Sequence, residues 1–90
     1  MAYGSISVGN TATLICAANT KRQELTIVNT SETVNIFVGP DVSVTTTNGI
    51  ILYGMQRNDR WKGPGGSWLG PIYGITASDT ADVRYWEVER

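Results

Sequence analysis

The sequence has no histidine and only one cysteine. Histidine is the commonest general base and metal ligand in proteins, so its absence removes the usual centre of an acid–base or metal site. One cysteine cannot form a disulfide within the chain, and Cys16 stands in an apolar run where we expect a small buried side chain. We therefore predict no catalytic residues, no metal site and no cofactor, and we expect that the chain is not an enzyme.

Long hydrophobic runs and an excess of basic charge are also missing. No stretch approaches the ~20 apolar residues of a membrane-spanning helix, and residues 1–4 show no signal-peptide pattern. Seven basic residues stand against eight acidic ones, for a net charge of −1, and they are scattered along the chain. Nucleic-acid binding needs a basic stripe. We expect no nucleic-acid partner, no membrane partner, and synthesis in a reducing cytoplasm.

One catalytic alternative stays open, because two of the eight acidic residues could meet in space. A pair of carboxylates across a cleft can hydrolyse a glycosidic bond. Most of the acidic residues stand in expected turns or in the last expected strand, where they usually form turns or are solvated. The glycine-rich residues 63–66 lack the Lys-Ser/Thr ending of a phosphate-binding loop, so we interpret them as a surface loop.

The residues that are present indicate short strands and turns. The chain has ten glycines and three prolines, and no window keeps apolar residues at helical spacing. The alternating segments that predict strands are residues 4–8, 11–17, 23–29, 33–38, 42–46, 50–53, 72–77 and 81–88, with a weaker segment at 60–62. Asn48-Gly49 favours a two-residue type I′ turn that joins 42–46 to 50–53 in a hairpin.

About eight strands at intervals of roughly ten residues predict an all-β fold. We expect a single antiparallel β-sandwich domain over residues 1–90, with a jelly-roll-like topology; a simpler sandwich or a small barrel stays open. In so short a chain, the gain from one apolar core is close to the entropy lost on folding. We therefore expect the protein to oligomerise, because a subunit interface adds apolar burial.

The aromatic residues are the strongest candidates for a functional surface. Trp61 and Trp68 flank the glycine-rich loop, and Trp86 faces away from Tyr85 in the last strand. Three tryptophans are hard to bury in so small a domain, and exposed tryptophan beside arginine is typical of protein contacts and of sugar-stacking surfaces. The predicted interface residues are Arg60, Trp61, Trp68, Tyr73 and Trp86. Alternatively, Trp61 and Trp68 cap one end of the sandwich.

Several segments of the chain follow one another in a characteristic order. Residues 19–29, NTKRQELTIVN, fit the pattern N-x-x-R-x-x-L-x-I-x-N, and residues 34–39, 44–52, 70–75 and 81–87 continue it. On these residues the chain resembles a family of small bacteriophage virion proteins, over about residues 10–88. Residues 63–69 depart from the family, whose chains are shorter there.

The resemblance implies a structural role in the virion. The family comprises head and tail accessory proteins, including capsid decoration (cement) proteins that bind the assembled head and stabilise it, commonly as homotrimers. We therefore expect a capsid decoration protein located in the virion, with itself and the major capsid protein as partners. The resemblance carries no catalytic residues. The alternative is a tail or head-fibre module that binds a carbohydrate or a receptor through the tryptophans, with Asn58 and Asp59 as polar partners.

Overall fold

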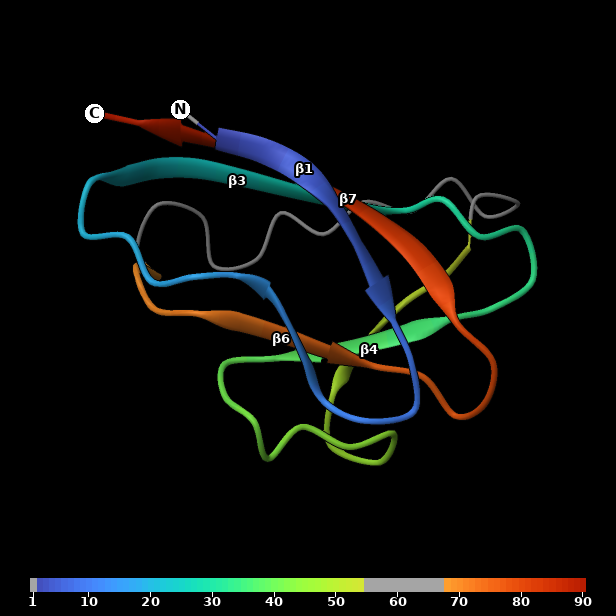
Figure 1. Ribbon diagram of the computed structural model, residues 1–90. Helices are drawn as coiled ribbons and strands as arrows, with labels where there is room; N and C mark the ends of the chain where they lie inside the picture. Colours follow the sequence, from blue (N-terminus) through green and yellow to red (C-terminus); the bar gives the residue numbers. More distant parts are fainter. Residues whose placement is uncertain (1, 55–67) are drawn as a thin grey trace.

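The computed structural model describes residues 2–54 and 68–90. The strands in these ranges are β1 (Ala2–Val8), β2 (Thr13–Cys16), β3 (Arg22–Asn29), β4 (Ile36–Gly39), β5 (Ile50–Leu52), β6 (Ile72–Ile75) and β7 (Ala81–Glu89). They form a three-stranded sheet in the order β1-β7-β3 and a four-stranded sheet in the order β2-β6-β4-β5. All neighbouring strands are antiparallel. Figure 1 shows the two sheets as the upper and lower layers of a sandwich.

Strict alternation of side chains organises the three-stranded sheet. Its central strand, β7, pairs with β1 on one side and with β3 on the other. Because successive side chains in a strand point to opposite faces, alternate residues of β7 enter the core. The inward-facing residues are Ala81, Val83, Tyr85 and Glu87, and the outward-facing residues are Asp82, Arg84 and Trp86. This matches the alternation read from the last strand of the sequence.

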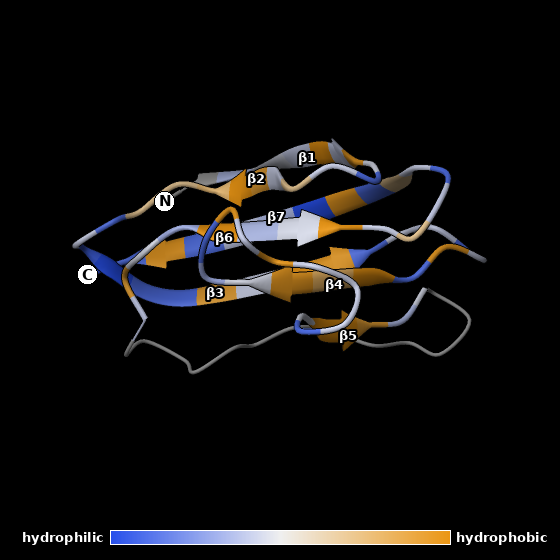
Figure 2. Cartoon of the chain, turned by 90° about the horizontal axis from the view of Figure 1, so that it is seen from below, coloured by the Kyte–Doolittle hydropathy of each residue, from blue (hydrophilic) through white to orange (hydrophobic). Residues whose placement is uncertain are grey.

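The four-stranded sheet is built differently, from short runs that are apolar at almost every position. β4 reads IFVG, β5 reads IIL and β6 reads IYGI. Such runs are usual where a strand is covered on both faces. Figure 2 shows β4 and β5 as almost continuously hydrophobic, whereas the colour of β7 changes along its length.

A single apolar core lies between the two sheets. Its fully buried residues come from both layers, and Ile6, Val34, Trp68 and Tyr85 pack against them. The core residues are Val8, Ile15, Cys16, Leu25, Ile27, Ile36, Val38, Leu52, Ile72, Ala81 and Val83. Cys16 is buried, which confirms the prediction of a small buried side chain.

The connection between β4 and β5 contradicts the sequence-based prediction. Residues 42–46 are not a strand, and Asn48-Gly49 is not a two-residue hairpin turn; β4 pairs directly with β5 across the loop 40–49. Within that loop the amide of Gly49 donates to the carbonyl of Thr45 at 2.9 Å, and the side-chain oxygen of Asn48 accepts from the amide of Thr45 at 2.7 Å. These bonds close a wider turn in place of the expected hairpin.

Packing of Val44 explains why the loop folds in this way. The Val44 side chain is buried and lies over Gly39, where an added Cβ would come within 2.9 Å of it. An added Cβ at Gly49 would lie 2.7 Å from Cβ of Phe37. The two glycines therefore leave the space in which the loop folds back on the sheet.

The sandwich architecture is as predicted, but its finer description differs. The described residues form seven strands where the sequence predicted about eight, because 42–46 is a loop. The three-plus-four arrangement of these strands does not show a jelly-roll topology. The weaker strand predicted at 60–62 lies outside the described residues.

Candidate functional site

Arg22, at the start of β3, is fully buried at one end of the sandwich. Its guanidinium group has five N–H donors. Nε donates to the Glu87 carboxylate at 2.6 Å. The remaining bonds run to the carbonyl oxygens of Ala17 (2.8 Å), Trp68 (3.0 Å) and Gly70 (2.9 Å) and to the sulfur of Cys16 (3.5 Å). Every donor is thus used, which is how a buried cation avoids a large desolvation penalty.

Glu87 is the anionic partner of this cluster. Its carboxylate accepts from Arg22, from the amide nitrogen of Asn19 at 2.9 Å and from the thiol of Cys16 at 3.4 Å. Burial alone acts to raise the pKa of the Glu87 carboxyl, but the hydrogen bonds from Asn19, Arg22 and Cys16 outweigh it and hold the pKa below its ordinary value. Burial, together with the charge of Glu87, raises the pKa of the Cys16 thiol.

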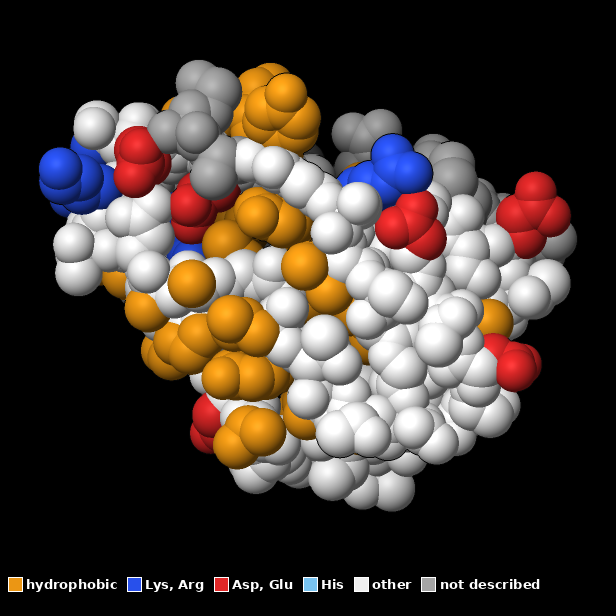
Figure 3. Space-filling view, in the orientation of Figure 1, with side chains coloured by type: hydrophobic (Ala, Val, Ile, Leu, Met, Phe, Trp, Pro, Cys, Tyr) orange, Lys and Arg blue, Asp and Glu red, His pale blue; other side chains and the backbone are white. Residues whose placement is uncertain are grey.

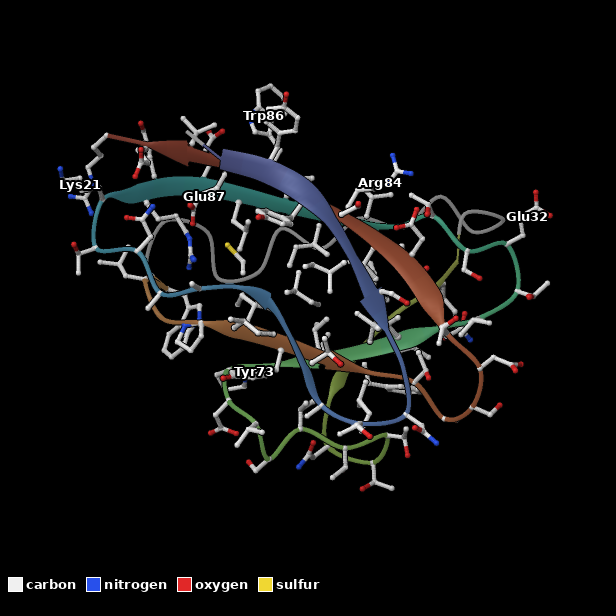
Figure 4. All side chains as sticks on the ribbon, in the orientation of Figure 1. Lys21, Glu32, Tyr73, Arg84, Trp86 and Glu87 are labelled. Carbon is white, nitrogen blue, oxygen red and sulfur yellow. The ribbon has the colours of Figure 1, made fainter. Side chains whose placement is uncertain are left out.

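The chemistry of this cluster is structural. A buried thiol with a raised pKa stays protonated at neutral pH and is a poor nucleophile. An arginine whose donors are all bonded has no N–H group left for a ligand. The cluster instead ties β2, β3, β7 and residues 68–70 together. Figure 4 shows Glu87 on the inner side of the upper layer. Sequence analysis missed it, because Arg22 was counted among scattered basic residues and Glu87 among solvated acids.

Asn29 plays a similar part at the other end of β3. Its side chain is fully buried, and its amide nitrogen donates to the carbonyl oxygens of Val34 at 2.7 Å and Leu52 at 3.3 Å. Its side-chain oxygen accepts from the amide of Ser31 at 3.0 Å. This residue therefore connects the end of the three-stranded sheet to β5 in the opposite layer.

Trp68 lies at the same end of the sandwich as Arg22. It is half-buried, packs against the core, and donates from its indole nitrogen to the carbonyl of Pro71 at 3.0 Å. This position agrees with the alternative in which Trp68 caps one end of the sandwich. The other tryptophan of that alternative, Trp61, lies outside the described residues, as do Arg60, Asn58 and Asp59.

The outer face of the four-stranded sheet is apolar. Tyr73 lies opposite Leu14, and Phe37 lies opposite both Ile75 and Ile51. These five side chains, which we call the apolar outer face, point away from the buried residues of the same strands. Leu14 is 41% exposed and Ile51 38% exposed, and the other three are half-buried. Figure 3 shows hydrophobic side chains gathered on the side of the molecule that holds β2 and β6.

The outer face of the three-stranded sheet is mostly polar, with two exposed aromatic rings. Tyr3 and Trp86 are direct cross-strand partners, and Thr26 lies on the other side of Trp86. Tyr3 is 81% exposed and Trp86 56% exposed. The sequence analysis named Trp86 but not Tyr3. Tyr3 stands two positions before Ser5 in β1, so the alternation of the strand places both side chains on the outer face.

Three of the predicted interface residues, Trp68, Tyr73 and Trp86, lie in the part of the chain that the structure describes, and they lie apart from one another. Tyr73 and Trp86 point away from the core on opposite sides of the molecule, as Figure 4 shows. Trp68 lies at one end of the sandwich, half-buried. The described aromatic candidates therefore lie on two different outer faces and, for Trp68, against the core.

Within residues 2–54 and 68–90 no group of three or more histidine, cysteine, aspartate or glutamate side chains is placed to hold a metal ion. The same residues form no helix with the length and hydrophobicity needed to cross a bilayer. Comparisons of the chain with protein-family models, with curated proteins and with solved structures gave no match.

Proposed function

We propose that this chain is a bacteriophage virion structural protein, a capsid decoration protein that binds the assembled head as a homo-oligomer, in the first instance a trimer. The observation that carries the proposal is the apolar outer face. Leu14 and Ile51 remain 41% and 38% exposed there. A contiguous apolar surface on a small soluble domain is typical of a contact with another protein.

The occupant that we assign to this face is a second copy of the chain. The outward positions of β2, β6, β4 and β5 carry no charged side chain, so the face matches another surface of the same apolar chemistry. Full burial of an aliphatic side chain stabilises an interface by about 1.5–3 kcal/mol. Several such side chains per subunit would also offset the marginal stability expected of so short a chain.

Attachment to the major capsid protein and location in the virion rest on the sequence resemblance. Synthesis in the host cytoplasm and the expectation of no nucleic-acid, membrane or enzymatic role rest on the charge, hydropathy, histidine and cysteine content of the sequence. Weak contacts suffice for a decoration protein, because an oligomer that engages several capsid sites at once gains effective concentration. We retain a jelly-roll topology within the proposal, and an experimental map that traces the whole chain tests it.

Sedimentation equilibrium of the purified chain tests the subunit contact. We expect an oligomer for the natural sequence and a folded monomer for the double variant Leu14→Glu/Ile51→Glu, because two buried carboxylates oppose association. The matched control is Ser5→Glu/Ser7→Glu, which adds the same charge to the outer face of the other sheet and should leave the mass unchanged. Co-sedimentation with purified capsids then tests attachment. A strict monomer that ignores capsids contradicts the proposal.

A further inference from the structure

The outer face of the three-stranded sheet carries a shallow groove beside the two exposed rings. Cross-strand pairing places its side chains in two rows over β1, β7 and β3. The first row is Tyr3, Trp86 and Thr26, and the second is Ser5, Arg84 and Val28. We call these six residues the aromatic groove. None of them belongs to the apolar outer face or to the buried Arg22 cluster.

The two rings of the groove contribute little to the core. Trp86 and Tyr3 are 56% and 81% exposed, and neither is among the residues that pack against the core. Trp68 shows the contrast, since its ring packs against the core and its indole nitrogen is bonded. Gly4, the residue after Tyr3, also lines the groove.

The polar groups of the groove are hydroxyls and one neutralised cation. Ser5 and Thr26 supply hydroxyl groups that can donate and accept. Arg84 forms an ion pair with Asp82, to which its Nε and Nη2 donate at 3.1 and 2.9 Å. That pair cancels the charge of the groove. A phosphate or another anion would find no free positive field here, and a cation would find no free carboxylate in the groove.

This combination points to a neutral polyhydroxylated ligand. The faces of aromatic rings carry partial negative charge, so they attract the slightly positive C–H groups on one face of a sugar ring. Hydroxyl and guanidinium groups beside the rings can bond the sugar hydroxyls. Val28 is the only aliphatic side chain of the groove, in contrast to the apolar outer face that we assign to a subunit contact. We infer that the aromatic groove binds a neutral oligosaccharide, with Tyr3 and Trp86 as the stacking surface.

Binding of the full-length chain to an array of neutral hexose and N-acetylhexosamine oligosaccharides, followed by titration of the best ligand, tests the inference. We expect Trp86→Ala and Tyr3→Ala each to lower the affinity at least about tenfold, because each removes one stacking ring. Trp86→Phe keeps a ring and should retain most of the binding. The matched control is Ser7→Ala, an outward residue of the same strand as Tyr3 but outside the groove.

Two results overturn the inference. One is an array on which the natural protein binds nothing, and the other is binding that Trp86→Ala and Tyr3→Ala leave unchanged while circular dichroism shows the fold intact. The oligomer mass separates this outcome from the proposed function. If Trp86→Ala keeps the mass, the subunit contact stands whatever the array shows. If Trp86→Ala yields a monomer and the array is blank, the groove is a protein contact and the oligosaccharide site is rejected.

Discussion

The two sheets differ in which residues they bury and which they expose. The three-stranded sheet carries Arg22, Asn29 and Glu87 on its inner face, all of them buried. The four-stranded sheet carries Leu14 and Ile51 on its outer face, both more than one-third exposed. The difference teaches that residue type alone does not decide burial. A charged side chain can be buried when every donor finds an acceptor, and an apolar one stays exposed until another surface covers it.

The largest effect is expected where the inner polar residues are removed. Arg22→Ala should lower the free energy of unfolding by about 3–5 kcal/mol, because it leaves Glu87 charged and buried without its cation. Urea denaturation at pH 7 measures the change, and Lys21→Ala, at the exposed neighbouring position, is the control. A loss below about 1 kcal/mol would mean that the buried polar residues of the three-stranded sheet contribute little to the free energy of unfolding.

The two described tryptophans allow a similar comparison, because Trp68 packs against the core and Trp86 is exposed. Trp68→Ala should lower the free energy of unfolding by about 3 kcal/mol, because it opens a space against the core. Trp86→Ala should change it by less than about 1 kcal/mol, since the ring is 56% exposed. Thermal denaturation of both variants gives the ranking. Equal losses would show that Trp86 supports the fold and is not available for a ligand.

The smallest expected effect is a dependence on pH. The pKa of Glu87 lies below its ordinary value near 4.5, so its charged form stabilises the fold at neutral pH, and this contribution is lost as the pH falls through the lowered pKa. Glu87→Gln lacks the charge at every pH. The natural protein should therefore be more stable than Glu87→Gln at pH 7, and the gap should narrow below pH 4.5. Urea denaturation across this range measures the gap; a constant or widening one contradicts the assignment.

Alternation along the strands was the part of the fold that the sequence could predict. The period of two in the last strand predicted that Trp86 faces away from Tyr85, and the structure packs Tyr85 against the core and leaves Trp86 56% exposed. The residues named in the pattern N-x-x-R-x-x-L-x-I-x-N also have structural roles here. Asn19 and Arg22 bond Glu87, Leu25 and Ile27 are in the core, and Asn29 links the layers.

Two features could not be predicted, because they depend on contacts between segments distant in sequence. The chain forms a wider loop in place of the hairpin expected at Asn48-Gly49, because Val44 is buried over Gly39. Local turn preference says nothing of that packing. Arg22 is surrounded by carbonyl groups of separate segments, and no spacing in the sequence reveals that these meet. The apolar runs of β4 and β6 are of the kind that is usual where both faces of a strand are covered.

The bonds of Arg22 also have a consequence for the order of events in folding. Its partners Glu87, Gly70 and Trp68 lie 65, 48 and 46 residues away along the chain. Closing such long loops is entropically unfavourable, so we expect these bonds to form late in folding. Interactions that are absent from the folding transition state slow unfolding and leave the folding rate almost unchanged. We therefore expect the bonds of Arg22 to lengthen the lifetime of the folded molecule more than they speed its formation.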